Sequence, residues 1–125
     1  MEKFSIKREN ICFATRFSLV SKNGLFSITA YICDVVNGEI DVKRDTCSFT
    51  IAISKDNTDY EELKNAIRNI EEYVKGEYPN IVNFNTSANI EYKKLNSILR
   101  KMDYAVYSIS NENEHTFNLY KKEVK

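Results

Sequence analysis

Apolar residues fall at every second position through most of the first half of the chain. The runs 11–19, 25–36 and 47–53 follow this alternation, which is typical of strands that bury one face. Asn-Gly pairs at 23–24 and 37–38 separate such runs, and Asn-Gly between apolar runs is a strong hairpin signal. The pattern therefore predicts an antiparallel meander of three or four strands.

A short run at 39–43 supplies the fourth strand of this prediction. The alternate positions of the predicted strands, among them Ser27, Thr29 and Tyr31, are polar or mixed. A sheet of this kind packs helices on one face and leaves the other face open to solvent. An open face or edge can pair with another chain, so a homodimer is one expected state.

The spacing of apolar residues changes from two to three and four after residue 58, which predicts an amphipathic helix. Thr58 with Glu61 is a capping-box pattern for its start, and Gly76 followed by Pro79 marks its end. The opposite face carries charges of both signs three or four apart, which indicates a solvated face. The apolar positions are Tyr60, Leu63, Ala66, Ile67, Ile70, Tyr73 and Val74, and the charged positions are Glu61, Lys64, Arg68, Glu71, Glu72 and Lys75.

Short apolar runs at 81–84, 104–109 and 116–120 predict three further strands. Cap-type residues at 85–89 precede a second predicted helix, and 121–125 is expected to be a frayed tail. The expected order is β-β-β(β)-α-β-α-β-β, which is an α+β fold. The inner face of the second helix carries Leu95, Ile98, Leu99 and Met102.

A length of 125 residues is typical of one domain, so we expect residues 1–125 to form a single domain. The formal net charge is zero, which argues against a strong attraction to nucleic-acid phosphates or anionic lipid. No run approaches the length of a membrane span, and the N-terminus lacks the pattern of a signal peptide. We therefore expect a cytoplasmic protein that does not bind a membrane.

Three cysteines, Cys12, Cys33 and Cys47, lie inside apolar strand-like runs and form no C-x-x-C pair. Such cysteines behave as small buried hydrophobic residues, which suits a reducing compartment. His115 is the only histidine, so neither a catalytic triad nor a metal site can be assembled around it. We expect no metal, and we expect His115 to be a strand residue beside a turn.

The stretch from Ser48 to Tyr120 resembles the C-terminal part of a GNAT-type N-acetyltransferase domain. A strand runs into a long helix, the helix leads to a strand ending in Asn83-Phe84-Asn85-Thr86, and a second helix and two strands follow. The resemblance implies a GNAT-like mixed, mainly antiparallel sheet with two helices. The two helices that usually follow the family's first strand have no counterpart in this sequence.

In the family, the pyrophosphate of acetyl-CoA lies on a glycine-containing loop between the fourth strand and the next helix. Small residues are needed there because backbone N–H groups at the helix N-terminus must approach the phosphates. The corresponding stretch, 54–62, contains no glycine and carries the carboxylates of Asp56, Asp59, Glu61 and Glu62. Thr58 and this acidic first turn would satisfy the same N–H groups. We therefore expect no cofactor, with acetyl-CoA as the ligand only under an atypical binding mode.

The resemblance also implies a position for a catalytic acid. Many members place a tyrosine seven residues after the asparagine that begins the second helix, where it protonates the leaving thiolate. Counting from Asn89 reaches Asn96 instead of a tyrosine, and Tyr92, one turn earlier, could be proposed as the acid instead. A tyrosine on a helix is more often a packing residue than an acid, so the sequence assigns no catalytic residue.

The second helix carries a basic stripe, because Lys93 and Arg100, and likewise Lys94 and Lys101, are seven residues apart. Together with Tyr92, we interpret this stripe as the partner-binding surface. Another protein is the expected partner. Nucleic acid is a weaker alternative, because the net charge is zero and no nucleic-acid motif is present.

These features predict a non-catalytic protein-interaction module. Asn, Ile, Lys and Tyr are abundant, which is the bias of an AT-rich genome. With the small size of the chain, this bias favours a phage or mobile-element inhibitor of a host defence protein, comparable to an anti-CRISPR protein. The alternative is an acyl-CoA-dependent N-acetyltransferase with an atypical cofactor loop.

Overall fold

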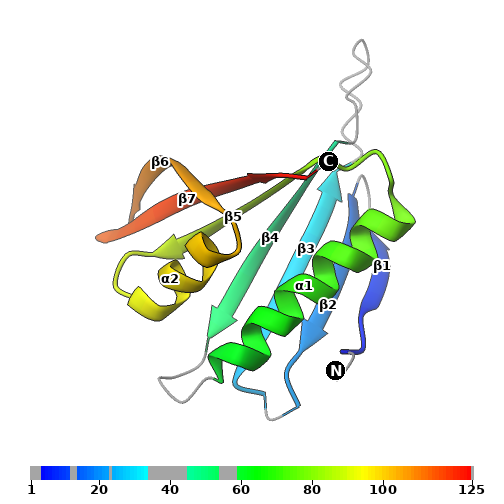
Figure 1. The fold of residues 1–125 in the computed structure, drawn as a ribbon, viewed down its shortest axis with the longest axis horizontal. Helices are drawn as coiled ribbons and strands as arrows, with labels where there is room; N and C mark the ends of the chain where they lie inside the picture. The colour runs from blue at the N-terminus through cyan, green and yellow to red at the C-terminus, as the bar shows by residue number, and fades with distance from the viewer. Residues whose placement is uncertain (1–3, 12–13, 23, 34–44, 54–58, 125) are drawn as a thin grey trace.

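The computed structural model describes residues 4–11, 14–22, 24–33, 45–53 and 59–124. Within these ranges the chain forms a seven-stranded sheet in the order β1-β2-β3-β4-β5-β7-β6, with two helices (Figure 1). The predicted α+β class and element order are confirmed. The elements are β1 (Lys7–Ile11), β2 (Ala14–Val20), β3 (Phe26–Cys33), β4 (Thr46–Ile53), α1 (Tyr60–Glu77), β5 (Asn83–Asn89), α2 (Lys93–Lys101), β6 (Ala105–Glu112) and β7 (His115–Glu123).

The first four strands form an antiparallel meander, in which β2, β3 and β4 are the strands that the alternation predicts. The strand predicted over 11–19 corresponds to β2 but begins too early, because β2 begins at Ala14 and Ile11 is the last residue of β1. Hydrophobic alternation does not reveal β1, since it lies at the edge of the sheet and carries Lys7, Arg8 and Glu9. The expected strand at 39–43 and the Asn-Gly pair at 37–38 lie outside the described residues.

The hairpin between β2 and β3 closes where the first Asn-Gly pair predicts it. Gly24 has φ +72°, a backbone conformation that favours glycine. Its N–H donates to the carbonyl of Ser21 at 3.0 Å, and the N–H of Ser21 donates to the carbonyl of Phe26 at 3.0 Å. The turn therefore fixes the register in which Phe17 faces Ala30 on the buried side of the sheet.

Helix α1 buries the predicted apolar positions, but both of its ends differ from the sequence interpretation. Asp59 is the N-cap residue, and its carboxylate accepts hydrogen bonds from the N–H groups of Glu61 and Glu62. Thr58 lies outside the described residues. At the other end the helix continues one residue past Gly76 and ends at Glu77, with Tyr78 as its C-cap residue, because Pro79 follows and cannot extend the hydrogen-bonding pattern.

Both helices pack on the same face of the sheet, where α1 crosses β1–β4 and α2 lies beside β5 and β7 (Figure 1). Their buried side chains meet the inward positions of the strands in one hydrophobic core. The outward positions of β3 and β4 are polar and partly or fully exposed, as predicted. The core includes Phe17, Ile28, Ala30, Cys47, Phe49, Leu63, Ile67, Ile70, Val74, Phe84, Leu95, Leu99, Met102, Tyr104 and Tyr120.

The end of the described chain is an integral part of the sheet. Strand β7 pairs with β5 on one side and with β6 on the other. It extends to Glu123, and the N–H of Val124 donates to the carbonyl of Val82 at 2.7 Å. The prediction of a frayed tail over 121–125 is therefore wrong for 121–124, because those residues have a strand partner that sequence alternation does not show.

Strands β4 and β5 are the parallel pair of this sheet, and they stay together only briefly. Thr46, Cys47 and Ser48 pair with Asn83, Phe84 and Asn85, respectively. Beyond these positions β4 continues to Ile53 and β5 to Asn89 without pairing with one another. The two strands therefore diverge into a fork, which is visible in Figure 1 to the left of α1.

Candidate functional site

A groove of about 380 Å³ runs between the first turns of α1 and the outward side of α2. Three lysines and two carboxylates line it together with one aromatic and one aliphatic side chain. The ammonium of Lys94 lies 5.6 Å from the ring centroid of Tyr60, a distance at which a cation is attracted to the ring. The lining residues are Asp59, Tyr60, Glu61, Lys64, Lys94, Ser97, Ile98 and Lys101.

The start of α1 forms one wall of this groove, and its free N–H groups are partly occupied. The carboxylate of Asp59 accepts from the N–H of Glu61 at 3.0 Å and from that of Glu62 at 3.2 Å. An incoming phosphate would meet this carboxylate and the side chain of Glu61. The carboxylate of Asp59 thus occupies two of the donors of this turn, whereas Thr58, to which the sequence analysis gave that role, lies outside the described residues.

The fork between β4 and β5 holds a buried polar atom of its own. Thr86 follows directly after the last parallel pair and is only 7% exposed. Its hydroxyl oxygen has no hydrogen-bond partner among the described residues. Buried polar groups are usually paired, so this hydroxyl is a group that a bound molecule could engage.

Asn96 occupies the position to which counting from Asn89 leads, and the structure buries it to 4% exposure. Its side-chain N–H₂ donates to the carbonyls of Asn89 at 3.0 Å and Tyr92 at 2.8 Å. Its side-chain oxygen accepts from Asn118 at 3.0 Å and from the hydroxyl of Tyr120 at 2.5 Å. All four hydrogen-bonding positions of this amide are thus filled, and an amide has no proton to give to a leaving group.

The local structure around Asn96 corrects the helix prediction. Asn89 is the last residue of β5, and α2 begins only at Lys93 with Tyr92 as its N-cap residue. The helix has nine residues. The polar run 85–89, which the sequence analysis interprets as a capping segment for this helix, is part of β5 and pairs with β7. The side chain of Asn89 accepts from the N–H of Glu91 and turns the chain into the helix.

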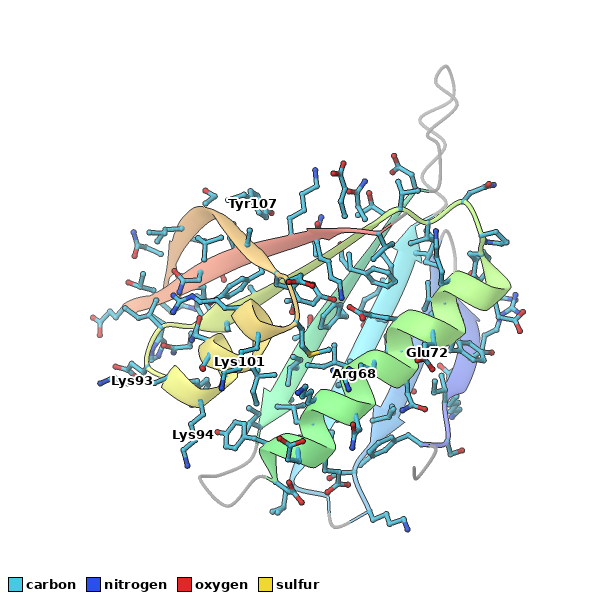
Figure 2. All side chains as sticks on the ribbon, viewed as in Figure 1. Arg68, Glu72, Lys93, Lys94, Lys101 and Tyr107 are labelled. Carbon is cyan, nitrogen blue, oxygen red and sulfur yellow. The ribbon has the colours of Figure 1, made fainter. Side chains whose placement is uncertain are left out.

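The five predicted partner-binding residues all lie at the surface, on two sides of α2. Lys94 and Lys101 line the groove, whereas Tyr92, Lys93 and Arg100 are exposed outside it. Figure 2 shows Lys93 and Lys94 at the start of α2 and Lys101 at its end. The sequence interpretation did not identify Tyr60 and Lys64 as members of this site. It assigned Tyr60 to the core and Lys64 to a solvated face, and no pattern along one helix shows which second helix lies opposite.

A second polar cluster joins α1 to β7 and to the residue before β6. The hydroxyl of Tyr104 donates to a carboxylate oxygen of Glu71 at 2.6 Å, and the ammonium of Lys122 lies 3.1 Å from both oxygens. The predicted solvated position of Glu71 is therefore wrong. Burial, with the negative charge of Glu71 second, raises the pKa of Tyr104 far above its usual value. A phenol held neutral in this way is a poor proton donor and is fixed in the core.

The described part of the chain contains no set of side chains that could bind a metal ion. No group of three or more His, Cys, Asp or Glu side chains is placed to hold an ion there. Cys47 is a buried free thiol, as predicted, while Cys12 and the side chain of Cys33 lie outside what the structure describes. His115 begins β7 beside the turn, where the sequence places it. Among the described residues no helix is long and apolar enough to cross a membrane.

The fold is that of the GNAT N-acetyltransferases. An acetyltransferase of the GNAT family from Streptococcus pneumoniae superimposes with a TM-score of 0.66 at 9% identity, over 88% of this chain and 67% of that one. The ribosomal-protein-S5-alanine acetyltransferase of Vibrio fischeri gives 0.62 at 9% identity, over 89% and 62%. An aminoglycoside acetyltransferase in complex with coenzyme A gives 0.61 at 9% identity, over 89% and 66%.

The likeness to these structures extends to the fold and not to the sequence. The chain spans about two thirds of the length of the acetyltransferases that it resembles. No family model matches the sequence, and no curated protein is similar to it. The predicted GNAT-like sheet with two helices is confirmed.

Proposed function

We propose that this chain is a non-catalytic protein-binding module built on the GNAT fold. The observation that carries the proposal is the saturated amide of Asn96, at the position where the resemblance implies a catalytic tyrosine. The neighbouring tyrosines do not replace that acid. Tyr92 is 45% exposed on the helix cap, and Tyr104 is held neutral by burial and by Glu71.

The surface that we assign to the partner is the exposed basic side of α2 with the adjoining groove. Lys94 and Lys101 line the groove beside Tyr60, and Lys93, Arg100 and Tyr92 extend the surface outward. Basic side chains around an aromatic ring suit an acidic protein surface, because opposite potentials steer association. The neutral net charge of the chain keeps this attraction local to α2.

The biological setting that we infer is a phage or mobile genetic element, with a host defence protein as the partner. The support is the AT-rich residue usage and the small size of the chain. An inhibitor of this kind acts by covering a surface of its target, as an anti-CRISPR protein does, and it needs no catalytic group.

The test compares two charge-reversal variants in affinity capture from a low-GC bacterial host, followed by titration of the captured protein in purified form. Lys94→Glu with Lys101→Glu should weaken binding at least tenfold, since like charges would then face an acidic partner. Lys7→Glu with Lys22→Glu changes the net charge equally at exposed positions outside the groove and should leave binding unchanged. Equal loss in both variants, or no loss in either, would contradict the assignment.

A second candidate is an acyl-CoA-dependent N-acetyltransferase with an atypical loop. It is favoured by the three lysines of the groove and the unpartnered hydroxyl of Thr86 at the fork. Titration of acetyl-CoA at low ionic strength tests it directly. Micromolar binding that is lost in Lys64→Glu with Lys94→Glu would favour this candidate over the first, and no heat up to millimolar acetyl-CoA would remove it.

A further inference from the structure

The two outer strands of the sheet differ in how they meet solvent. Edge strand β1 is charged, and Glu9 forms ion pairs with Lys7 at 2.8 Å and with Arg16 on β2. Edge strand β6 carries no charged residue between Ala105 and Asn111. Charged side chains are a common device against edge-to-edge pairing, so β1 is protected and β6 is not.

Three large apolar side chains of β6 are exposed to solvent. Val106 is 41% exposed, Tyr107 is 58% exposed and Ile109 is 61% exposed. The strand pairs only with β7, and no described residue pairs with its free edge. An eight-residue strand with this composition presents unpaired N–H and carbonyl groups beside apolar surface. Pairing of this edge with another strand would satisfy both.

We infer that β6 pairs antiparallel with β6 of a second copy of this chain, so that two sheets join into one. The charges at the two ends of β6 favour a second copy. Glu112 lies at one end, and Ala105 at the other end pairs with Lys121 of β7. Antiparallel pairing of two copies brings Glu112 of each copy beside Ala105 of the other, within reach of Lys121.

Both charges lie on the same face of the joined sheet. Glu112 pairs with His115 and Ala105 pairs with Lys121, and these two residues of β7 are an even number of positions apart. The side chain of Ala105 is small, so Glu112 can reach over it. The symmetry of the pair therefore creates two identical ion pairs, as a closed two-fold interface requires.

The register follows from the pairing of β6 with β7. Seven residues of β6 are paired, and Tyr107 is the residue left out at the irregularity between Val106 and Ser108. Matching the two ends places the middle residue, Ile109, opposite itself on the two-fold axis. The Ile109 and Val106 side chains lie on the helix-bearing face, because they pair with Asn118 and Tyr120. Dimer formation thus shields Ile109, the most exposed apolar side chain of this strand, from water.

Disulfide trapping at the axis tests the register. Residues directly opposite one another in antiparallel strands have Cα atoms about 4.5–5.5 Å apart, which suits a disulfide. Ile109→Cys should give a covalent dimer under mild oxidation in the full chain. Val20→Cys places an equally exposed thiol on β2, and this variant should remain monomeric on a non-reducing gel. The unaltered chain, which keeps its own cysteines, should remain monomeric as well.

Charge exchange tests the partner. In sedimentation velocity, Glu112→Lys should weaken dimer formation by about 5- to 30-fold, and the added Lys121→Glu should restore it. A chain that stays monomeric up to about 100 µM would overturn the inference, since such a dimer would be weaker than ordinary specific complexes. A dimer that is unaffected by Glu112→Lys and does not cross-link through Ile109→Cys would overturn it as well. Neither outcome depends on whether the α2 surface binds another protein.

Discussion

The hydroxyl of Tyr104 donates a hydrogen bond of 2.6 Å to Glu71, and this contact joins the start of β6 to the middle of α1. Lys122 of β7 completes the cluster with its ammonium 3.1 Å from each oxygen of Glu71. Three elements that are distant in sequence thus meet at one carboxylate, with little solvent around it. The cluster fixes the second half of the sheet against the first helix.

Replacement of Tyr104 by phenylalanine should destabilise the protein by about 1–3 kcal/mol near neutral pH, because a buried hydrogen bond to a charged group is lost. Urea unfolding of the two proteins measures the difference. Tyr107→Phe removes a hydroxyl from an exposed tyrosine and serves as the matched control. Equal stability of Tyr104→Phe and the unaltered protein would show that this contact contributes nothing.

The same pair predicts how stability depends on alkaline pH. The pKa of Tyr104 is raised in the folded protein from its ordinary value of 10.0, first by burial and then by Glu71. The folded state therefore favours the neutral phenol, and this contribution is complete below pH 10 and is lost as the pH rises further. The stability gap between the unaltered protein and Tyr104→Phe should narrow between about pH 9.5 and pH 11. A gap that stays constant or widens would contradict the raised pKa.

Asn96 should be the polar residue of α2 with the largest effect on stability. Asn96→Leu keeps a similar volume but leaves the Tyr120 hydroxyl and two backbone carbonyls without their partner, for an expected loss of about 2–4 kcal/mol. Ser97→Ala on the exposed side of the same helix should change stability by less than about 0.5 kcal/mol. Urea unfolding compares the two, and a loss under about 1 kcal/mol for Asn96→Leu would argue against a saturated, buried amide.

Replacement of two glycines by alanine should change the stability of the protein in opposite directions. Gly24 has φ +72°, so Gly24→Ala should destabilise the β2–β3 hairpin by about 1 kcal/mol. Gly76 lies in the last turn of α1, and an added Cβ there would meet nothing within 4 Å. Gly76→Ala should therefore stabilise the protein by about 0.5–1 kcal/mol. Thermal unfolding of both variants checks the pair, and a shift in the same direction for both would contradict these conformations.

The sequence predicts those parts of the fold in which buried residues recur at regular intervals along the chain. The alternation in β2–β4 and the three-and-four spacing in α1 both report one buried face, and the structure buries those faces. The misses occur where burial follows from a distant neighbour. Strand β1 is polar because it lies at the edge of the sheet. The run 85–89 belongs to a strand although it looks polar, because its polar outward residues alternate with the buried Phe84, Thr86 and Ala88.

The sequence predicts only the α2 part of the candidate site. The spacing of Lys94 and Lys101 marks a basic side of α2, but their proximity to Tyr60 and Lys64 depends on how α1 and α2 lie relative to one another in the fold. Asn96 carries no sequence signal for its role, since its partners Asn118 and Tyr120 come from β7, more than twenty residues later. Long-range hydrogen bonds of this type leave no period in the sequence.

Strand β7 lies between β5 and β6 although it follows both in the sequence. During synthesis, β5 and β6 therefore leave the ribosome before the strand that joins them exists. A chain interrupted before Thr116 would keep the meander and α1, yet it would expose the edges of β5 and β6 and leave Asn96 and Glu71 without partners on β7. The sheet is therefore complete only when the last strand is present, and a prematurely terminated product would retain open strand edges that can pair with other chains.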